Sequence, residues 1–186
     1  MRDRDPFERA METLRTRLAQ SGPLQGAPLS ISALASDLGI STTPVREALS
    51  RLAGEGLVVR RAQGYVAPEH NPDSLSQLYD LARVLVSAGL THDTALSDDL
   101  LGAAALATRN QALADACGRL RAQLAPLADA ERQLFDAEAE RTRLINAAGK
   151  GARALSMEIG RYYARRSEVS GQILAVAIGL LKYRRI

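Results

Sequence analysis

Three hydroxyl side chains stand directly before a candidate helix, and an arginine follows one turn later. Ser41, Thr42 and Thr43 offer hydroxyls and the unpaired backbone N–H groups of a helix start, which suit phosphate oxygens. Arg46 lies on the face opposite the apolar positions, where a guanidinium can bond the O6 and N7 edge of guanine. Arg51 is further along the same helix and better placed for a phosphate. These residue types at this spacing predict contact with double-stranded DNA through the major groove.

A second basic group follows at a predicted β-hairpin. Arg60 and Arg61 end the first strand, and Gln63 and Gly64 belong to the small turn that comes next. A hairpin of this size can place its tip against the sugar-phosphate backbone or in the minor groove. We therefore include Arg60, Gln63 and Gly64 among the candidate DNA contacts.

Each of these features also has a simpler interpretation. Arg46 can pair with nearby Glu47 on a solvated helix face, and Ser41 or Thr42 can serve as an N-cap only. The charge of Arg60 can protect an edge strand from unwanted pairing. What favours a nucleic-acid interface is the ordered set of cap, turn, arginine-bearing helix and hairpin.

The elements that must position these residues can be read from apolar spacing and from caps. Apolar residues at intervals of three or four predict the helices, Gly39 allows the turn between the second and third of them, and β-rich runs predict the hairpin. The result is a winged helix-turn-helix. We expect helices at 6–20, 32–38 and from near 44 to 53, and strands at 57–61 and 65–67.

The rest of the chain predicts a second, helical domain. Residues 68–72 contain two prolines and no apolar side chain, as an interdomain linker does. The expected division is a DNA-binding domain at 1–67, this linker, and an effector-binding or dimerisation domain at 73–186. The fold class is mainly α, with an N-terminal winged helix-turn-helix and a C-terminal all-α bundle. We expect its helices near 73–90, 93–108, 110–125, 128–147 and 151–182.

Composition narrows the class of protein. A net charge of +3, 46% hydrophobic residues and one cysteine fit a soluble cytoplasmic protein without disulfides. We find no signal peptide and no apolar run long enough to span a membrane. There is also no nucleophile–base pair, phosphate-binding glycine loop or metal-ligand spacing, so we expect neither an enzyme nor a bound cofactor.

The segment "STTPVREALSRLAGEGLV" at 41–58 resembles the GntR family of bacterial regulators, and the resemblance covers about residues 7–67. It implies a winged helix, a homodimer on a pseudo-palindromic operator, and a C-terminal domain that binds an effector. By position, Arg46 matches the family's base-contacting arginine, and Ser41, Thr43 and Gly64 match contact positions. Thr42 departs from the family, where arginine is common, so affinity or operator choice is expected to differ.

The second domain resembles the FadR (FCD) branch of that family, in a shortened form. Many members of the branch hold a divalent metal with one Asp and three His, but Arg141 stands where the first histidine is expected. His70 lies in the linker and His92 beside a helix start, so we expect no metal site. Without a metal, an acidic effector needs another anchor. The candidates are Arg83, Arg141 and Tyr79, with Arg143, Tyr162 and Tyr163 as further polar candidates; surface ion pairs and core packing are the alternatives.

Two functions remain open at this point. The first is a homodimeric transcription repressor or activator whose operator affinity changes when a small, acidic metabolite binds. The second is a winged-helix dimer that regulates through DNA or protein contact without any effector.

Overall fold

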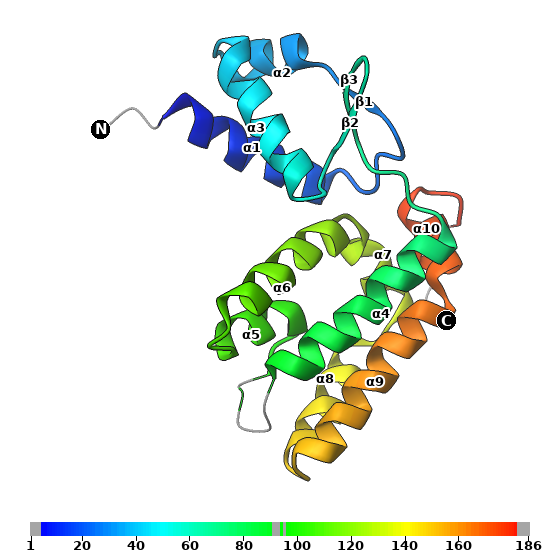
Figure 1. Cartoon of the computed structure of the whole chain (residues 1–186). Helices are drawn as coiled ribbons and strands as arrows, with labels where there is room; N and C mark the ends of the chain where they lie inside the picture. Colours follow the sequence, from blue (N-terminus) through cyan, green and yellow to red (C-terminus); the bar gives the residue numbers. More distant parts are fainter. Residues whose placement is uncertain (1–4, 91–93, 95, 182–186) are drawn as a thin grey trace. The chain divides into compact units, whose positions relative to one another are not determined.

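The computed structural model describes residues 5–90, 94 and 96–181, and it divides into two compact units, 1–70 and 71–186. The first unit holds three helices and a small sheet, and the second is helical throughout its described part (Figure 1). This confirms the predicted fold class of a winged helix-turn-helix followed by an all-α bundle. No helix in the described part of the chain is long and apolar enough to cross a membrane.

The helices of the first unit begin and end where local caps direct them. Helix α1 spans Pro6–Gln20, α2 spans Ile31–Leu38 and α3 spans Thr42–Gly54. The side chains of Asp5 and Ser30 accept hydrogen bonds from the first turns of α1 and α2. Between α2 and α3 the chain reverses at Gly39, whose φ of 63° lies in the left-handed region that favours glycine.

A three-stranded antiparallel sheet completes the first unit. Strands β2 (Val59–Arg61) and β3 (Gly64–Val66) form the predicted hairpin, with Arg61 paired to Gly64 across a two-residue loop. Strand β1 (Pro28–Leu29) adds to the other edge of β3, in the order β1-β3-β2. A strand of two residues that begins with proline leaves no alternating pattern, so the sequence did not predict it. The expected strand at 57–61 begins only at Val59, because the backbone N–H of Leu57 still donates to the carbonyl of Leu52 at the end of α3, at 2.9 Å.

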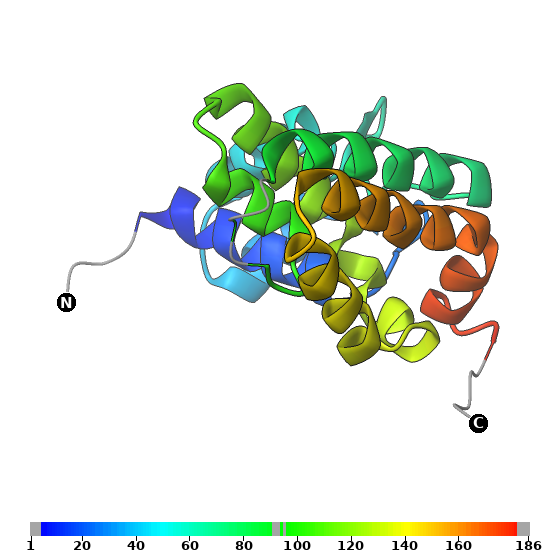
Figure 2. The ribbon, with the colours of Figure 1, turned by 90° about the horizontal axis from the view of Figure 1, so that it is seen from below.

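The second unit is a bundle around a continuous apolar core. Helices α4 (Pro72–Gly89) and α9 (Ala152–Glu168) pack side by side, as both views show (Figures 1 and 2). Asn71 and Ser74 form a capping box at the start of α4. The remaining elements are α5 (Leu100–Ala107), α6 (Gln111–Leu124), a 3-10 turn at Ala125–Leu127, α7 (Ala128–Leu134), α8 (Ala137–Ala148) and α10 (Ser170–Ala177).

Three of the predicted helices of this unit are wrong in extent. Of the helix expected at 93–108, residues 93 and 95 lie outside the described part, and α5 begins at Leu100, where Asp99 caps it by accepting a hydrogen bond from Gly102 N. The helix expected at 128–147 is interrupted: Phe135 is extended and Asp136 caps a new helix. The helix expected at 151–182 breaks at Val169, and α10 then packs against α4 and α7. In each case a cap or a core contact outweighs the periodicity.

Candidate functional site

The candidate DNA contacts lie on exposed parts of the first unit. Ser41, Thr42 and Thr43 are exposed at the start of α3, and Arg46 is exposed one turn later. Ser41 occupies the N-cap position of α3, but its side chain makes no capping hydrogen bond. Its hydroxyl is therefore not used to satisfy the helix start, unlike that of Ser30, which caps α2. The opposite face of α3 is fully buried and fixes the helix against the core.

Several arginines of this unit form hydrogen bonds or ion pairs with other residues of the unit. Arg9 donates to the carbonyl oxygen of Leu38 at 3.1 Å. Arg15 pairs with Glu55 at 2.5 Å, and Arg17 with Asp37 at 3.0 Å. The Nε atom of Arg51 lies 3.6 Å from a carboxylate oxygen of Glu55. Arg51, a predicted phosphate contact, therefore shares an acid with Arg15.

Three other arginines are in the opposite situation. Within the described part of the chain, Arg46, Arg60 and Arg61 make no ion pair or side-chain hydrogen bond with another residue. All three are exposed, as is Gln63 at the tip of the hairpin. Arg46 does not pair with Glu47, which was the simpler interpretation of its position. Among the arginines of this unit that the structure describes, those without a protein partner thus lie on α3 and on the wing.

The hairpin turn has a geometry that suits its small size. Gly64 has a φ of 131°, and an added Cβ there meets no atom within 4 Å, so backbone conformation rather than space favours glycine. Ala62 and Gln63 form the exposed turn itself.

Comparison with known proteins bears directly on this unit. Residues 6–65 match the sequence model described as "Bacterial regulatory proteins, gntR family". This part of the chain, which we call the gntR domain, is therefore similar to the gntR family of bacterial regulatory proteins, as the motif at 41–58 indicated. A comparison with curated protein sequences gave no match.

Solved structures resemble the chain beyond the gntR domain. Escherichia coli McbR/YncC has a TM-score of 0.63 at 18% identity, over 90% of this chain and 98% of that one. A putative transcriptional regulator GntR from Rhodococcus sp. RHA1 has a TM-score of 0.67 at 19% identity, over 91% and 97%. Lar of Listeria monocytogenes reaches 0.52 at 14% identity, over 91% and 98%. At these identities the likeness shows the fold alone, a gntR domain followed by a helical bundle.

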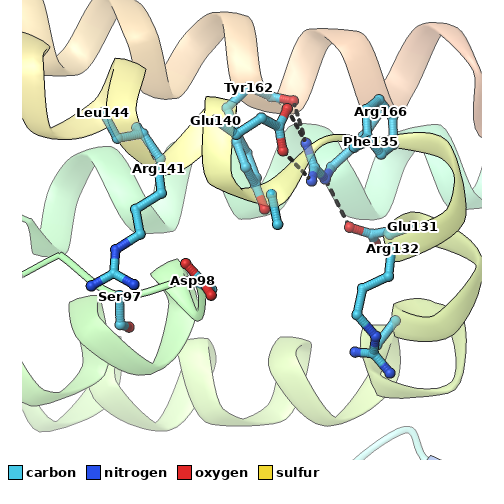
Figure 3. A pocket seen from close by; sticks show the side chains of 12 residues that line it. Ser97, Asp98, Glu131, Arg132, Phe135, Glu140, Arg141, Leu144, Tyr162 and Arg166 are labelled. Carbon is cyan, nitrogen blue, oxygen red and sulfur yellow. Dashed lines mark hydrogen bonds and ion pairs between the residues drawn. The ribbon is translucent and has the colours of Figure 1, made fainter.

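The second unit contains a pocket whose inner wall is an ion-pair cluster (Figure 3). Arg166 is 4% exposed, and its guanidinium donates to Glu140 through two nitrogens, at 3.1 and 2.8 Å, and to Glu131 at 2.8 Å. The same guanidinium lies 3.6 Å from the ring centre of Tyr162 and 4.3 Å from that of Phe135. A planar cation held by two carboxylates and two rings is well stabilised away from water.

Two neighbouring residues donate further hydrogen bonds to the carboxylates of Glu131 and Glu140. Arg165 donates to Glu140 at 2.9 Å, and the hydroxyl of Tyr79 donates to Glu131 at 2.6 Å. Burial and the Glu131 carboxylate raise the pKa of Tyr79, so this hydroxyl keeps its proton. Burial alone raises the pKa of Glu140, but hydrogen bonds from Arg166 and Arg165 outweigh it and hold that pKa below the ordinary value. The two arginines and the two carboxylates of the cluster thus contact one another.

The sequence-predicted effector residues are spread over different parts of this unit. Arg141 lines the pocket. Tyr79 is 1% exposed and bonds to Glu131 from behind the pocket wall, while Arg83 is exposed on α4 away from the lining residues. Arg143 is exposed and lies 3.7 Å from Glu158. Of the six candidates that the sequence offered, the structure thus brings Arg141 and the further candidate Tyr162 to the pocket.

Sequence reasoning missed the residues that dominate the pocket, Glu131, Glu140 and Arg166. A signal for Arg166 was present: it continues the 3–4 residue spacing of Leu155, Ile159 and Tyr162, which places a charge on the apolar stripe of α9. A charge on such a stripe needs a buried partner. No sequence pattern near Arg166 indicates that its carboxylate partners come from α7 and α8.

The pocket residues do not fit the divalent metal that the FadR-type resemblance implies. Such an ion needs several oxygen or nitrogen ligands at one place. No group of three His, Cys, Asp or Glu side chains within the residues described here could hold one, and His92 lies outside those residues. His70 is half-buried in the first unit, where burial lowers its pKa. Its backbone exchanges two hydrogen bonds with the Gln25 side chain.

Proposed function

We propose that the chain is a homodimeric transcription regulator that reads DNA with α3 and the β2–β3 wing. The observation that carries this is the sorting of arginines in the gntR domain. Arg9, Arg15, Arg17 and Arg51 contact protein groups, whereas Arg46, Arg60 and Arg61 are exposed and contact none that the structure describes. Exposed cations without protein partners are those best able to replace counterions on DNA.

We assign different roles to the two groups of contacts. Arg46 reads a base edge, because it is near the N-terminal end of α3, the part of such a helix that enters the major groove. Ser41, Thr42 and Thr43 bind phosphates through hydroxyls and first-turn N–H groups, and Arg60, Gln63 and Gly64 place the wing on the backbone or minor groove. Arg51 contributes less than predicted, because it already lies near Glu55.

A mobility-shift assay with the promoter region of the chain's own gene tests the proposal. Arg46→Ala should weaken binding by about 1–3 kcal/mol per half-site and relax the choice of base. The matched control is Arg17→Ala, which removes an exposed arginine of the same unit that pairs with Asp37. Equal affinity of wild type and Arg46→Ala, or an equal loss in both variants, would contradict the assignment.

The dimer is proposed to form through the second unit. Leu81 and Val84, three residues apart on α4, are 47% and 53% exposed, an apolar face that a second copy would cover. Leu81→Glu should shift the mass measured by light scattering toward the monomer. Leu106→Glu, which changes a leucine 90% exposed on α5, is the control and should leave the mass unchanged. A dimer that persists in Leu81→Glu would rule out this face.

We further propose that the second unit is a FadR-type sensor domain, because its helical bundle encloses a pocket with charged walls. A regulator without an effector is the second candidate, and one observation favours it. The buried arginine that an acidic ligand would use, Arg166, is already neutralised by the protein's own carboxylates. Thermal-shift screening of the purified protein separates the two candidates, because a sensor must be stabilised by its ligand.

A further inference from the structure

The pocket of the second unit is small and has two chemically distinct walls. Its volume is about 230 Å³, below the usual size for drug-like ligands, so it suits a molecule of a few heavy atoms. Helices α7, α8 and α9 form the inner wall, and the segment before α5 forms the outer one (Figure 3).

The ion-pair cluster of Glu131, Glu140 and Arg166 on the inner wall offers a ligand no unneutralised charge. Both oxygens of Glu131 and both oxygens of Glu140 accept hydrogen bonds from Tyr79, Arg165 and Arg166. Arg166 in turn gives a further hydrogen bond to the carbonyl oxygen of Tyr162. A ligand carboxylate placed here would meet two carboxylates that already share the available guanidinium, so a purely anionic ligand is disfavoured.

The outer part of the pocket is different, because its charges are unpaired. Arg141 extends from α8 toward the segment that carries Ser97 and Asp98 (Figure 3). Within the described residues, neither Arg141 nor Asp98 makes an ion pair or side-chain hydrogen bond, with each other or with any other side chain. Among its described lining residues, the pocket therefore presents Arg141 as a free cation and Asp98 as a free anion. Apolar lining is supplied by Leu144, which lies beside Arg141, and by Phe135, which lies beside Arg166 on the opposite side of the pocket (Figure 3).

We propose that this pocket binds a small α-amino acid as its zwitterion. The ligand carboxylate pairs with Arg141, its ammonium group pairs with Asp98, and a short aliphatic side chain packs on Leu144, which lies beside Arg141 (Figure 3). A simple carboxylate would satisfy Arg141 but would be repelled by Asp98, and a simple amine would have the opposite problem. This inference rests on the sensor role proposed above and replaces the acidic effector that the sequence suggested.

Titration calorimetry on the full chain tests the proposal with matched probes. L-alanine, L-valine and L-leucine supply zwitterions of increasing size, while isovalerate and isobutylamine are valine without its amino or its carboxyl group. We expect saturable binding of at least one amino acid, with isovalerate and isobutylamine at least about tenfold weaker. Arg141→Gln should weaken the amino acid at least about tenfold, and Arg83→Gln, which changes an exposed arginine away from the pocket, should not.

The variant Asp98→Asn provides a second test, in which the affinity for one probe is expected to increase. Removing this carboxylate should weaken the amino acid and strengthen isovalerate, because the repulsion of the carboxylate probe disappears. Binding of isovalerate to wild type as tightly as valine, or no binding by any amino acid probe, would overturn the proposal. The mobility-shift assay runs in parallel on the same protein. Amino-acid binding without DNA binding would contradict the proposed regulator function but support the proposed class of ligand. DNA binding without amino-acid binding would contradict the proposed class of ligand.

Discussion

Arg166 and Glu140 form a two-point ion pair in the interior of the second unit, with nitrogen–oxygen distances of 3.1 and 2.8 Å and both residues 4% exposed. The pair ties α9 to α8, and Glu131 adds α7 to the same guanidinium. Two charges at this depth lose most of their hydration, so they are tolerable only together. The cluster thus couples three helices through a small number of atoms.

Removing one member of this pair should be costly. Arg166→Met leaves the buried carboxylate of Glu140 with Arg165 alone and removes the cation from half-buried Glu131, and we expect a loss of about 3–5 kcal/mol in the free energy of unfolding. The double variant Arg166→Met/Glu140→Leu should lose less than the sum of its single variants, because no uncompensated charge remains at Glu140. Urea unfolding followed by circular dichroism measures these values. Arg161→Met is the control: it removes an arginine 64% exposed and should cost less than about 1 kcal/mol. Additive losses in the double variant would show that the pair is not coupled.

The same pair predicts how stability depends on pH. Glu140 has a pKa held below its ordinary value by Arg166 and Arg165, against the opposing effect of burial. A carboxyl with a lower pKa in the folded than in the unfolded chain stabilises the fold above its unfolded pKa, about 4.3. That contribution is lost as the pH falls from there through the folded pKa. Urea unfolding at pH 7, 5, 4 and 3 should therefore show a steeper acid loss in wild type than in Glu140→Gln. Parallel curves for the two proteins would refute the role of Glu140.

The wing should affect DNA binding differently from the recognition helix. Arg60 is exposed without a described protein partner, and we expect it to contact a phosphate. Arg60→Ala should weaken binding to specific and nonspecific duplexes alike and should reduce the slope of log affinity against log salt by about 1. Fluorescence anisotropy at several salt concentrations measures that slope. An unchanged slope, with Arg17→Ala as the reference, would place Arg60 away from the phosphates.

The turn before the recognition helix should depend on glycine. An added Cβ at Gly39 would meet no atom within 4 Å, but the φ of +63° makes any side chain there unfavourable. Gly39→Ala should therefore destabilise the fold by about 1 kcal/mol. Gly54→Ala is the matched control, since that site is equally open, lies at the end of α3 and has no positive φ. It should be neutral or slightly stabilising in thermal unfolding. Equal effects of the two changes would show that backbone conformation does not decide the turn.

The sequence by itself determined the gntR domain. Its caps at Asp5 and Ser30, its turn at Gly39 and its apolar spacing act over three or four residues, so they can be read directly from the chain. The exposed position of Arg46 follows from the same periodicity. Only the tertiary structure showed that Arg46 has no described protein partner, whereas Arg15 and Arg51 meet at Glu55.

The pocket was decided by tertiary structure alone. Arg166 lies 26 residues from Glu140 and 35 from Glu131 along the chain, and nothing local to any of them names its partner. The pairing requires the interruption at Phe135 that separates α7 from α8, which helical periodicity did not predict. Local rules act through neighbouring backbone groups and suffice for helices and turns. A buried charge cluster depends on which helices come together, and only the packed core determines that.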